Sequence, residues 1–120
     1  MLWYVLACMA WGFAKASVLG AHRAPGSHFL GGFGLPELAE ELEYRVVMER
    51  GLGQRMLGVN PAAARLAQAA LFGLAHPGLE VDAAVGGFVY SKAFDQHGLL
   101  GAVASHVAHN AGVWLGSSSK

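Results

Sequence analysis

The chain has few charged residues and a single cysteine, and both shortages exclude classes of protein. Charged residues make up 13% of the sequence, about half of the roughly 25% that is usual in soluble domains. The 8 basic and 8 acidic residues cancel, so the sequence predicts no nucleic-acid partner. The lone Cys8 excludes an intramolecular disulfide and a cysteine-rich zinc site. Hydrophobic residues are instead abundant, at 54% of 120 residues, which predicts one domain with apolar surface in excess.

The motifs of the commonest hydrolases are also missing. No serine stands in a Gly-x-Ser-x-Gly context, which argues against a serine nucleophile. No His-Glu-x-x-His is present, so the sequence evidence for a metal site is only indirect. No window alternates at period two for long enough to predict a strand. The fold class is therefore predicted to be all-α.

Residues 1–34 are predicted to form an N-terminal membrane helix and a connection rich in glycine and proline. Residues 1–19 are apolar except for Lys15, and 23–34 read RAPGSHFLGGFG. Two alternatives remain for 1–19. A secretory signal peptide is one, although its usual basic start is missing. The other is the buried core helix of a soluble domain.

Residues 35–116 are predicted to form the core of the protein, followed by a tail at 117–120. Proline and glycine divide this core into helices, and Asn60 precedes Pro61 as an N-cap and first-turn pair. A weak point is expected at Gly51 and Gly53. Helices are predicted at 36–57, 61–76, 81–94 and 99–115, which gives a bundle of four or five helices in all.

The bundle is predicted to be polytopic, with membrane lipid as a partner. Alanine- and glycine-rich faces permit the close helix contacts that are common in lipid. Several apolar stretches are shorter than the about 20 residues that span a bilayer upright, so a soluble helical bundle stays as the alternative. A basic connection containing Arg50, Arg55 and Arg65 would face the cytoplasm by the positive-inside rule. We expect an integral protein of a prokaryotic plasma membrane.

Two adjacent glutamates begin the helix predicted at 36–57. Neighbouring helical residues diverge by about 100°, whereas residues four apart share a face. Glu41 therefore pairs with Arg45, and Glu40 points elsewhere, free to act on a water. The alternative is a solvated acidic first turn made of Glu37, Glu40, Glu41 and Glu43, which the helix dipole would favour.

Two histidines and an asparagine lie in the later helices. His76 follows Phe72 by one turn at a helix C-terminus, where the alternative to catalysis is a role as a cap. His106 and Asn110 are four residues apart on an apolar helix, where unpaired polar groups are costly. His109 lies on a nearby face and is a candidate supporting residue.

Together these side chains supply the parts of a peptide hydrolase that uses an activated water. Glu40 and His76 are predicted to share the role of general base. His106 and Asn110 are predicted to donate hydrogen bonds to the oxyanion that develops on the scissile carbonyl. A zinc ion held by Glu40, His76 and His106 is the rival hypothesis, because this is a normal hydrolytic ligand set.

Three motifs resemble those of a known family, the CPBP intramembrane proteases of the CAAX-prenyl-protease and bacteriocin-immunity type. EELEYR at 40–45, LFGLAH at 71–76 and HVAHN at 106–110 look like the family patterns EExxxR, FxxxH and HxxxN. The resemblance extends over about 35–115, and three motifs in this order are far more specific than any one alone. Val46 stands where the family commonly has glycine, a departure that removes no catalytic group.

The resemblance implies a glutamic-type intramembrane endopeptidase that needs no cofactor. Its substrate would be a peptide or protein, lipidated or anchored to the membrane. The residues carried over by motif are Glu40, His76, His106 and Asn110 as catalytic groups, with Glu41, Arg45 and Phe72 in support. Zinc remains the alternative cofactor. A non-catalytic membrane binding or immunity protein, which keeps these residues for packing, is the alternative function.

Overall fold

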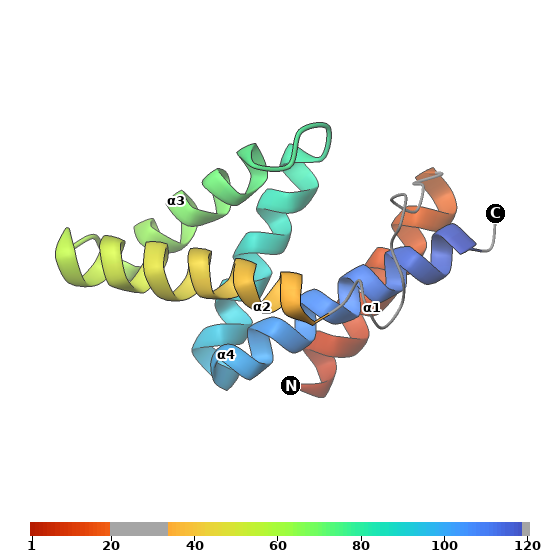
Figure 1. Cartoon of the computed structure of the whole chain (residues 1–120), viewed down its shortest axis with the longest axis horizontal. Helices are drawn as coiled ribbons and strands as arrows, with labels where there is room; N and C mark the ends of the chain where they lie inside the picture. The colour runs from red at the N-terminus through yellow and green to blue at the C-terminus, as the bar shows by residue number, and fades with distance from the viewer. Residues whose placement is uncertain (20–33, 119–120) are drawn as a thin grey trace.

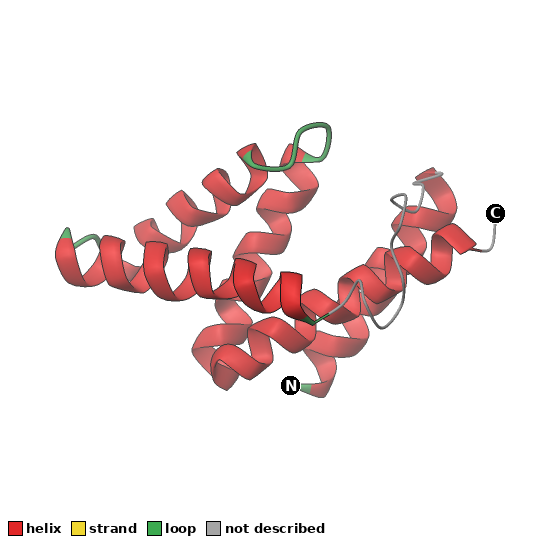
Figure 2. Ribbon diagram, in the orientation of Figure 1, coloured by secondary structure: helices red, strands yellow, loops and turns green. Residues whose placement is uncertain are grey.

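The computed structural model of the protein describes residues 1–19 and 34–118, and these form helices joined by short turns, without a strand (Figures 1 and 2). The prediction of an all-α fold is confirmed. The helices are α1 (Leu2–Leu19), α2 (Leu35–Glu41), η1 (Leu42–Met56), α3 (Pro61–Leu74) and α4 (Glu80–Ser118). The connection at 20–33 and the last two residues of the predicted tail lie outside the described residues.

α4 consists of two helices that meet at Gly98. This glycine has φ 72° and ψ −166°, so the helical winding is interrupted there. A side chain would be strained at such a φ, which explains why glycine occupies the position. The separate helices predicted at 81–94 and 99–115 are thus confirmed. The N-cap is confirmed as well, because the Asn60 side chain accepts a hydrogen bond from the Ala62 amide at 2.8 Å.

η1 corrects the α-helix predicted at 36–57, because it is a π-helix that continues directly from α2. The predicted weak point is wrong too, since η1 runs through Gly51 and Gly53. A row of buried charged residues runs along α2 and η1. Glu37, Glu41, Arg45 and Glu49 repeat every four residues and are all buried. Residues four apart share a helix face, so the row presents one charged face to the interior.

The helices form two groups that share α4 (Figure 1). The first half of α4 packs against α3, and η1 lies beside α3. The second half of α4 runs along α1, and glycines allow close approach there. A Cβ atom at Gly12 would overlap the His109 carbonyl, and one at Gly112 would overlap the Met9 carbonyl. The backbones of α1 and α4 are therefore in direct contact, as is common where small residues line a helix interface.

Among residues 1–19 and 34–118, no helix has both the length and the mean hydropathy of a membrane span. The polytopic arrangement therefore stays a prediction.

Candidate active site

The site begins with a row of buried charged residues along α2 and η1, and α4 supplies a polar partner to each carboxylate. Glu37 accepts a hydrogen bond from the Asn110 amide nitrogen at 2.9 Å. Glu41 contacts His106, and Glu49 accepts from the Ser91 hydroxyl at 2.6 Å. Buried carboxylates are costly unless they are paired. These contacts therefore fix how α2 and η1 lie against α4.

Glu41 lies at the centre of this row and has two partners. Its Oε1 is 2.9 Å from Arg45 Nε, and its Oε2 is 2.8 Å from His106 Nδ1. Arg45 also donates a hydrogen bond to Gln68 on α3. The Glu41 and Arg45 side chains are wholly buried, and that of His106 is 5% exposed. The predicted Glu41–Arg45 pair is thus present, and its contacts with Gln68 and His106 join α2 and η1 to α3 and α4.

Glu40 lies on a different face and meets His76. Its Oε2 is 3.5 Å from His76 Nε2, and each side chain is 33% exposed. His76 Nδ1 is 2.6 Å from the Phe72 carbonyl oxygen. A carbonyl only accepts, so Nδ1 carries the proton and donates it. Whenever the ring is neutral, Nε2 has no proton and faces the carboxylate, so the two groups can take up one proton between them and form a candidate general base.

Aromatic rings separate the two carboxylate–histidine pairs. The Phe72 ring centroid is 4.5 Å from that of His76 and 5.8 Å from that of His106. His106 also stacks on Tyr90, with ring centroids 4.6 Å apart. The Arg45 guanidinium lies 5.0 Å from the Phe72 ring centroid. Phe72 therefore contacts both imidazoles, and its supporting role stays a prediction.

A cavity of about 420 Å³ brings residues of the predicted site together. His76, His106 and Asn110 all line it, together with residues of α1 and the first half of α4. Glu40 is not among the lining residues, and His76 connects it to the cavity. With Nδ1–H donated to Glu41, His106 has Nε2 left for the cavity. The Asn110 amide likewise keeps one of its two N–H groups.

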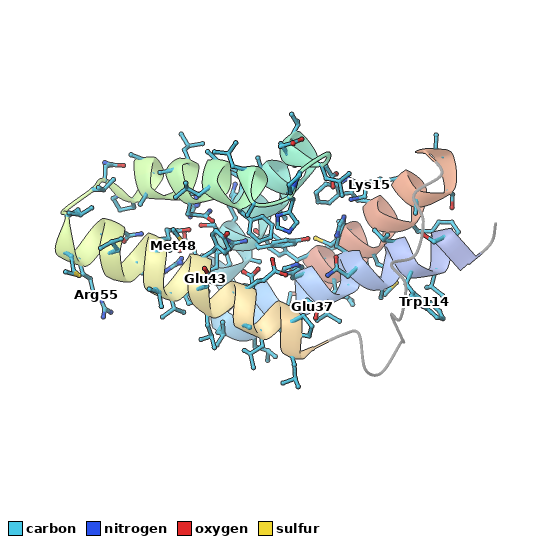
Figure 3. All side chains as sticks on the ribbon, turned by 45° about the horizontal axis from the view of Figure 1, so that its top comes forward. Lys15, Glu37, Glu43, Met48, Arg55 and Trp114 are labelled. Atoms are coloured by element: carbon cyan, nitrogen blue, oxygen red, sulfur yellow. The ribbon has the colours of Figure 1, made fainter. Side chains whose placement is uncertain are left out.

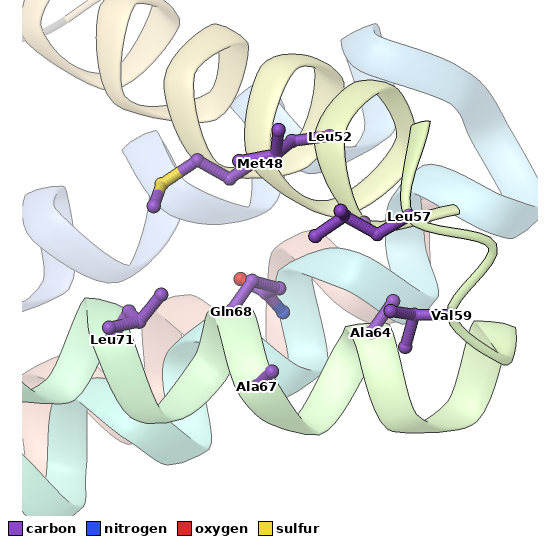
Figure 4. A pocket seen from close by; sticks show the side chains of 9 residues that line it. Met48, Leu52, Leu57, Val59, Ala64, Ala67, Gln68 and Leu71 are labelled. Carbon is purple, nitrogen blue, oxygen red and sulfur yellow. The ribbon is translucent and has the colours of Figure 1, made fainter. Parts of the chain in front are cut away.

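A smaller cavity of about 170 Å³ lies between η1 and α3 (Figure 4). Its walls are apolar side chains such as Met48, Leu52 and Leu71, with Gln68 as the polar exception. The Gln68 amide is already bonded to Arg45 and to the Gly87 carbonyl. This cavity therefore offers no catalytic group, and Gln68 closes it off from the buried ion pair.

The alternative of a solvated acidic first turn is wrong for two of its four members, because Glu37 and Glu41 are 1% and 0% exposed. Sequence reasoning missed Glu37, Glu49 and Gln68 as parts of the site. The repeat of charged residues every four positions was a signal for the first two. Gln68 gave no such signal, because its partner Arg45 is distant in sequence.

The cap alternative for His76 is also observed, since its ring bonds the Phe72 carbonyl through Nδ1 while Nε2 faces Glu40.

The described residues contain no group of three histidine, cysteine or acidic side chains that could hold a metal ion. Glu40 and His76 lie close together, but His106 is directed to Glu41. The geometry therefore does not assemble the zinc set of Glu40, His76 and His106.

A helical protein with two carboxylate–histidine pairs beside one cavity has the groups of a hydrolase. Comparison with protein families agrees, because residues 24–112 match the family described as type II CAAX prenyl endopeptidase Rce1-like. The chain belongs to this family, whose members are proteases. The resemblance noted in the three motifs is thereby confirmed. No curated protein and no solved structure matches the chain.

Proposed function

We propose that the protein is a glutamic-type endopeptidase that cleaves its substrate in the cavity lined by His76, His106 and Asn110. One observation carries the proposal. Two motif segments far apart in the sequence line this cavity, one with His76 and the other with His106 and Asn110, and Glu40 adjoins it through a contact of 3.5 Å with His76. These residues stand in the three motifs that resemble those of the CPBP proteases, and the motifs lie within the matched residues 24–112.

In this mechanism, a water is activated by Glu40 and His76. Its oxygen forms a bond to the scissile carbonyl carbon while one of its protons passes to the carboxylate–imidazole pair. Negative charge develops on the carbonyl oxygen. The free N–H of Asn110 and the Nε2–H of protonated His106 donate hydrogen bonds to that oxygen. The carbon–nitrogen bond then breaks, and the amine leaves with the proton held by the pair.

The second pair supports this chemistry without touching the substrate. Glu41 fixes the ring of His106 through Nδ1, and Arg45 balances the charge of Glu41. Because the imidazole is also stacked on Tyr90, its Nε2 is held toward the cavity. An oxyanion donor is effective when it is oriented before the reaction begins.

The substrate we propose is a membrane-associated peptide or protein, lipidated or anchored, and the enzyme an integral protein of a prokaryotic plasma membrane. Proteins of this family are membrane proteins. The surface offers apolar contact as well, because large side chains such as Trp3, Leu66 and Val81 are exposed. Exposed apolar surface of this kind is typical of membrane or protein contact.

Cleavage of a peptide library by the detergent-solubilised protein tests the proposal. Glu40→Gln is expected to lower the rate by about 10²- to 10⁴-fold, the usual contribution of a general base. Glu43→Gln is the matched control, because Glu43 is exposed on the adjoining η1. Full activity of a folded Glu40→Gln variant would contradict the proposal.

Metal analysis and an assay in chelator address the zinc hypothesis, which requires bound zinc and loss of activity in chelator.

A non-catalytic binding or immunity protein is the second candidate. It is favoured by the internal pairing of the buried carboxylates, since Glu37, Glu41 and Glu49 all have partners within the chain. On this hypothesis, Glu40→Gln and His106→Ala leave the biological function intact in cells. Loss of function in variants that still fold would count against it.

A further inference from the structure

A chain of hydrogen bonds leads from α1 across one end of the cavity to α2. Lys15 Nζ is 2.8 Å from His109 Nε2, and His109 Nδ1 is 3.1 Å from Asn110 Oδ1. The Asn110 amide nitrogen donates to Glu37 Oε2 at 2.9 Å. Figure 3 marks Lys15 and Glu37, the two ends of the chain. Asn110 therefore lies between two groups that both bear on its orientation.

The chemistry of the end groups sets the direction of every bond in this chain. An ammonium group only donates, so His109 Nε2 must accept from Lys15. The proton of the neutral imidazole is then on Nδ1, which donates to Asn110 Oδ1. A carboxylate only accepts, so the Asn110 amide nitrogen must face Glu37. Lys15 and Glu37 thus require the same orientation of the Asn110 amide, with Oδ1 toward His109 and the nitrogen toward Glu37.

Neighbouring side chains hold the Lys15 and His109 part of this hydrogen-bond chain in place. Lys15 is also paired with Asp82, which balances its charge, and the two side chains are 12% and 24% exposed. The His109 ring packs against Trp11 with ring centroids 4.6 Å apart. The glycine contact between Gly12 and the His109 backbone brings α1 close enough for Lys15 to reach the ring. Few other arrangements are open to His109 in so confined a space.

We propose that Lys15 is a positioning residue that acts through His109 to hold the Asn110 amide in the orientation that presents its free N–H to the cavity. A reversed amide would place a carbonyl oxygen near the developing oxyanion and repel it. The proposal deepens the function proposed above and rests on the oxyanion role of Asn110. It also gives α1 a role in catalysis, although Lys15 lies outside the matched residues 24–112.

The ring state of His109 can be measured without any substrate. In the full-length protein labelled with ¹⁵N-histidine, NMR is expected to show His109 as the neutral tautomer with the proton on Nδ1. The resonance is assigned by its absence in His109→Gln. Lys15→Met removes the donor and is expected to shift the ring toward the Nε2–H tautomer. Asp82→Asn keeps the ammonium and is expected to leave the tautomer unchanged. An Nε2–H ring in the wild-type protein would overturn the proposal.

Kinetics with a peptide that the wild-type protein cleaves give the second test. Lys15→Met is expected to lower kcat by about 10- to 100-fold with little change in KM. This loss of kcat is smaller than the about 10²- to 10³-fold loss that follows removal of an oxyanion donor itself. Lys15→Arg should restore most of kcat, because arginine also only donates. His109→Gln should retain most of kcat, since glutamine offers one acceptor and one donor, whereas His109→Leu should not.

A double-variant comparison separates positioning from general damage to the fold. If Lys15 acts through Asn110, Lys15→Met lowers kcat no further once Asn110→Ala is present. An equal loss in both backgrounds would overturn the proposal. Full activity of Glu40→Gln would instead refute the proposed function, and the tautomer of His109 would still report on the hydrogen-bond chain. The two failures are therefore distinguishable.

Discussion

Glu40 and Glu41 are neighbours in the sequence, yet each meets a histidine in a different environment. The Glu40–His76 contact is 3.5 Å long, and both side chains are one-third exposed. The Glu41–His106 contact is 2.8 Å long, buried, and joined by Arg45. Successive helical residues are about 100° apart, so adjacent carboxylates face two regions. Two pairs of the same chemical kind thus serve different purposes. They differ in burial and in the presence of Arg45 beside the second pair.

A reactive pair and a structural pair have opposite requirements. A general base needs access to water and a lone pair that no other group occupies. Glu40 and His76 meet this requirement, because both side chains are one-third exposed and the ring hydrogen-bonds the Phe72 carbonyl through Nδ1, which leaves Nε2 to the pair. A buried ion pair needs every charge to be matched. Glu41 meets that requirement through Arg45 and His106. We therefore assign water activation to the first pair and orientation of the site to the second.

The largest effect is expected from His76→Asn. The asparagine amide can still donate to the Phe72 carbonyl, but the base at Nε2 is lost. The cleavage rate should fall by about 10²- to 10⁴-fold, while the free energy of unfolding changes little. Steady-state kinetics and chemical denaturation in detergent measure the two quantities. A variant that retains its rate would show that the exposed pair is not the reactive one.

Arg45→Met should have its effect on stability. It leaves Glu41 buried without its cation, and breaking such a pair typically costs about 3–5 kcal/mol. Denaturant titration gives the free energy of unfolding. Arg55→Met is the matched control, since Arg55 is exposed on the same helix, and it should shift stability by less than about 0.5 kcal/mol. Equal stability of the two variants would remove the structural role from the buried pair.

Gly12→Ala should give the smallest effect and tests a contact remote from both pairs. Its methyl group would overlap the His109 carbonyl, so α1 must move away from α4. Overpacking of this kind costs about 1–3 kcal/mol, and thermal unfolding detects it. Ala14→Ser, at an exposed position of α1, serves as the control. Wild-type stability of Gly12→Ala would mean that α1 does not pack against His109 as described.

Local features of the fold were predictable from the sequence because their causes lie within a few residues. Asn60 caps the helix that begins at Pro61, and Gly98 interrupts α4 through its own φ. The pairing of Glu41 with Arg45 followed from their spacing of four. The split between Glu40 and Glu41 followed from the geometry of a helix. Each of these predictions needed only the neighbouring sequence.

Features that depend on distant partners were not predictable in this way. The sequence suggests Glu37 only as a member of the alternative solvated turn, because its partner, Asn110, is 73 residues away. The contact of Gln68 with Arg45 was not predictable, because nothing near Gln68 in the sequence explains it. The π-helical winding of η1 has no signal in the local sequence. Helical periodicity alone favoured an ordinary α-helix there.

The most direct test is a paired measurement of cleavage rate and unfolding free energy in Glu40→Gln and Glu41→Gln. We predict that Glu40→Gln loses cleavage at wild-type stability, because its partly exposed carboxylate acts on water. Glu41→Gln should lose stability, because Arg45 is left buried without its counter-charge. A Glu40→Gln variant that still cleaves, beside a stable Glu41→Gln variant that does not, would contradict the assignment of the two pairs.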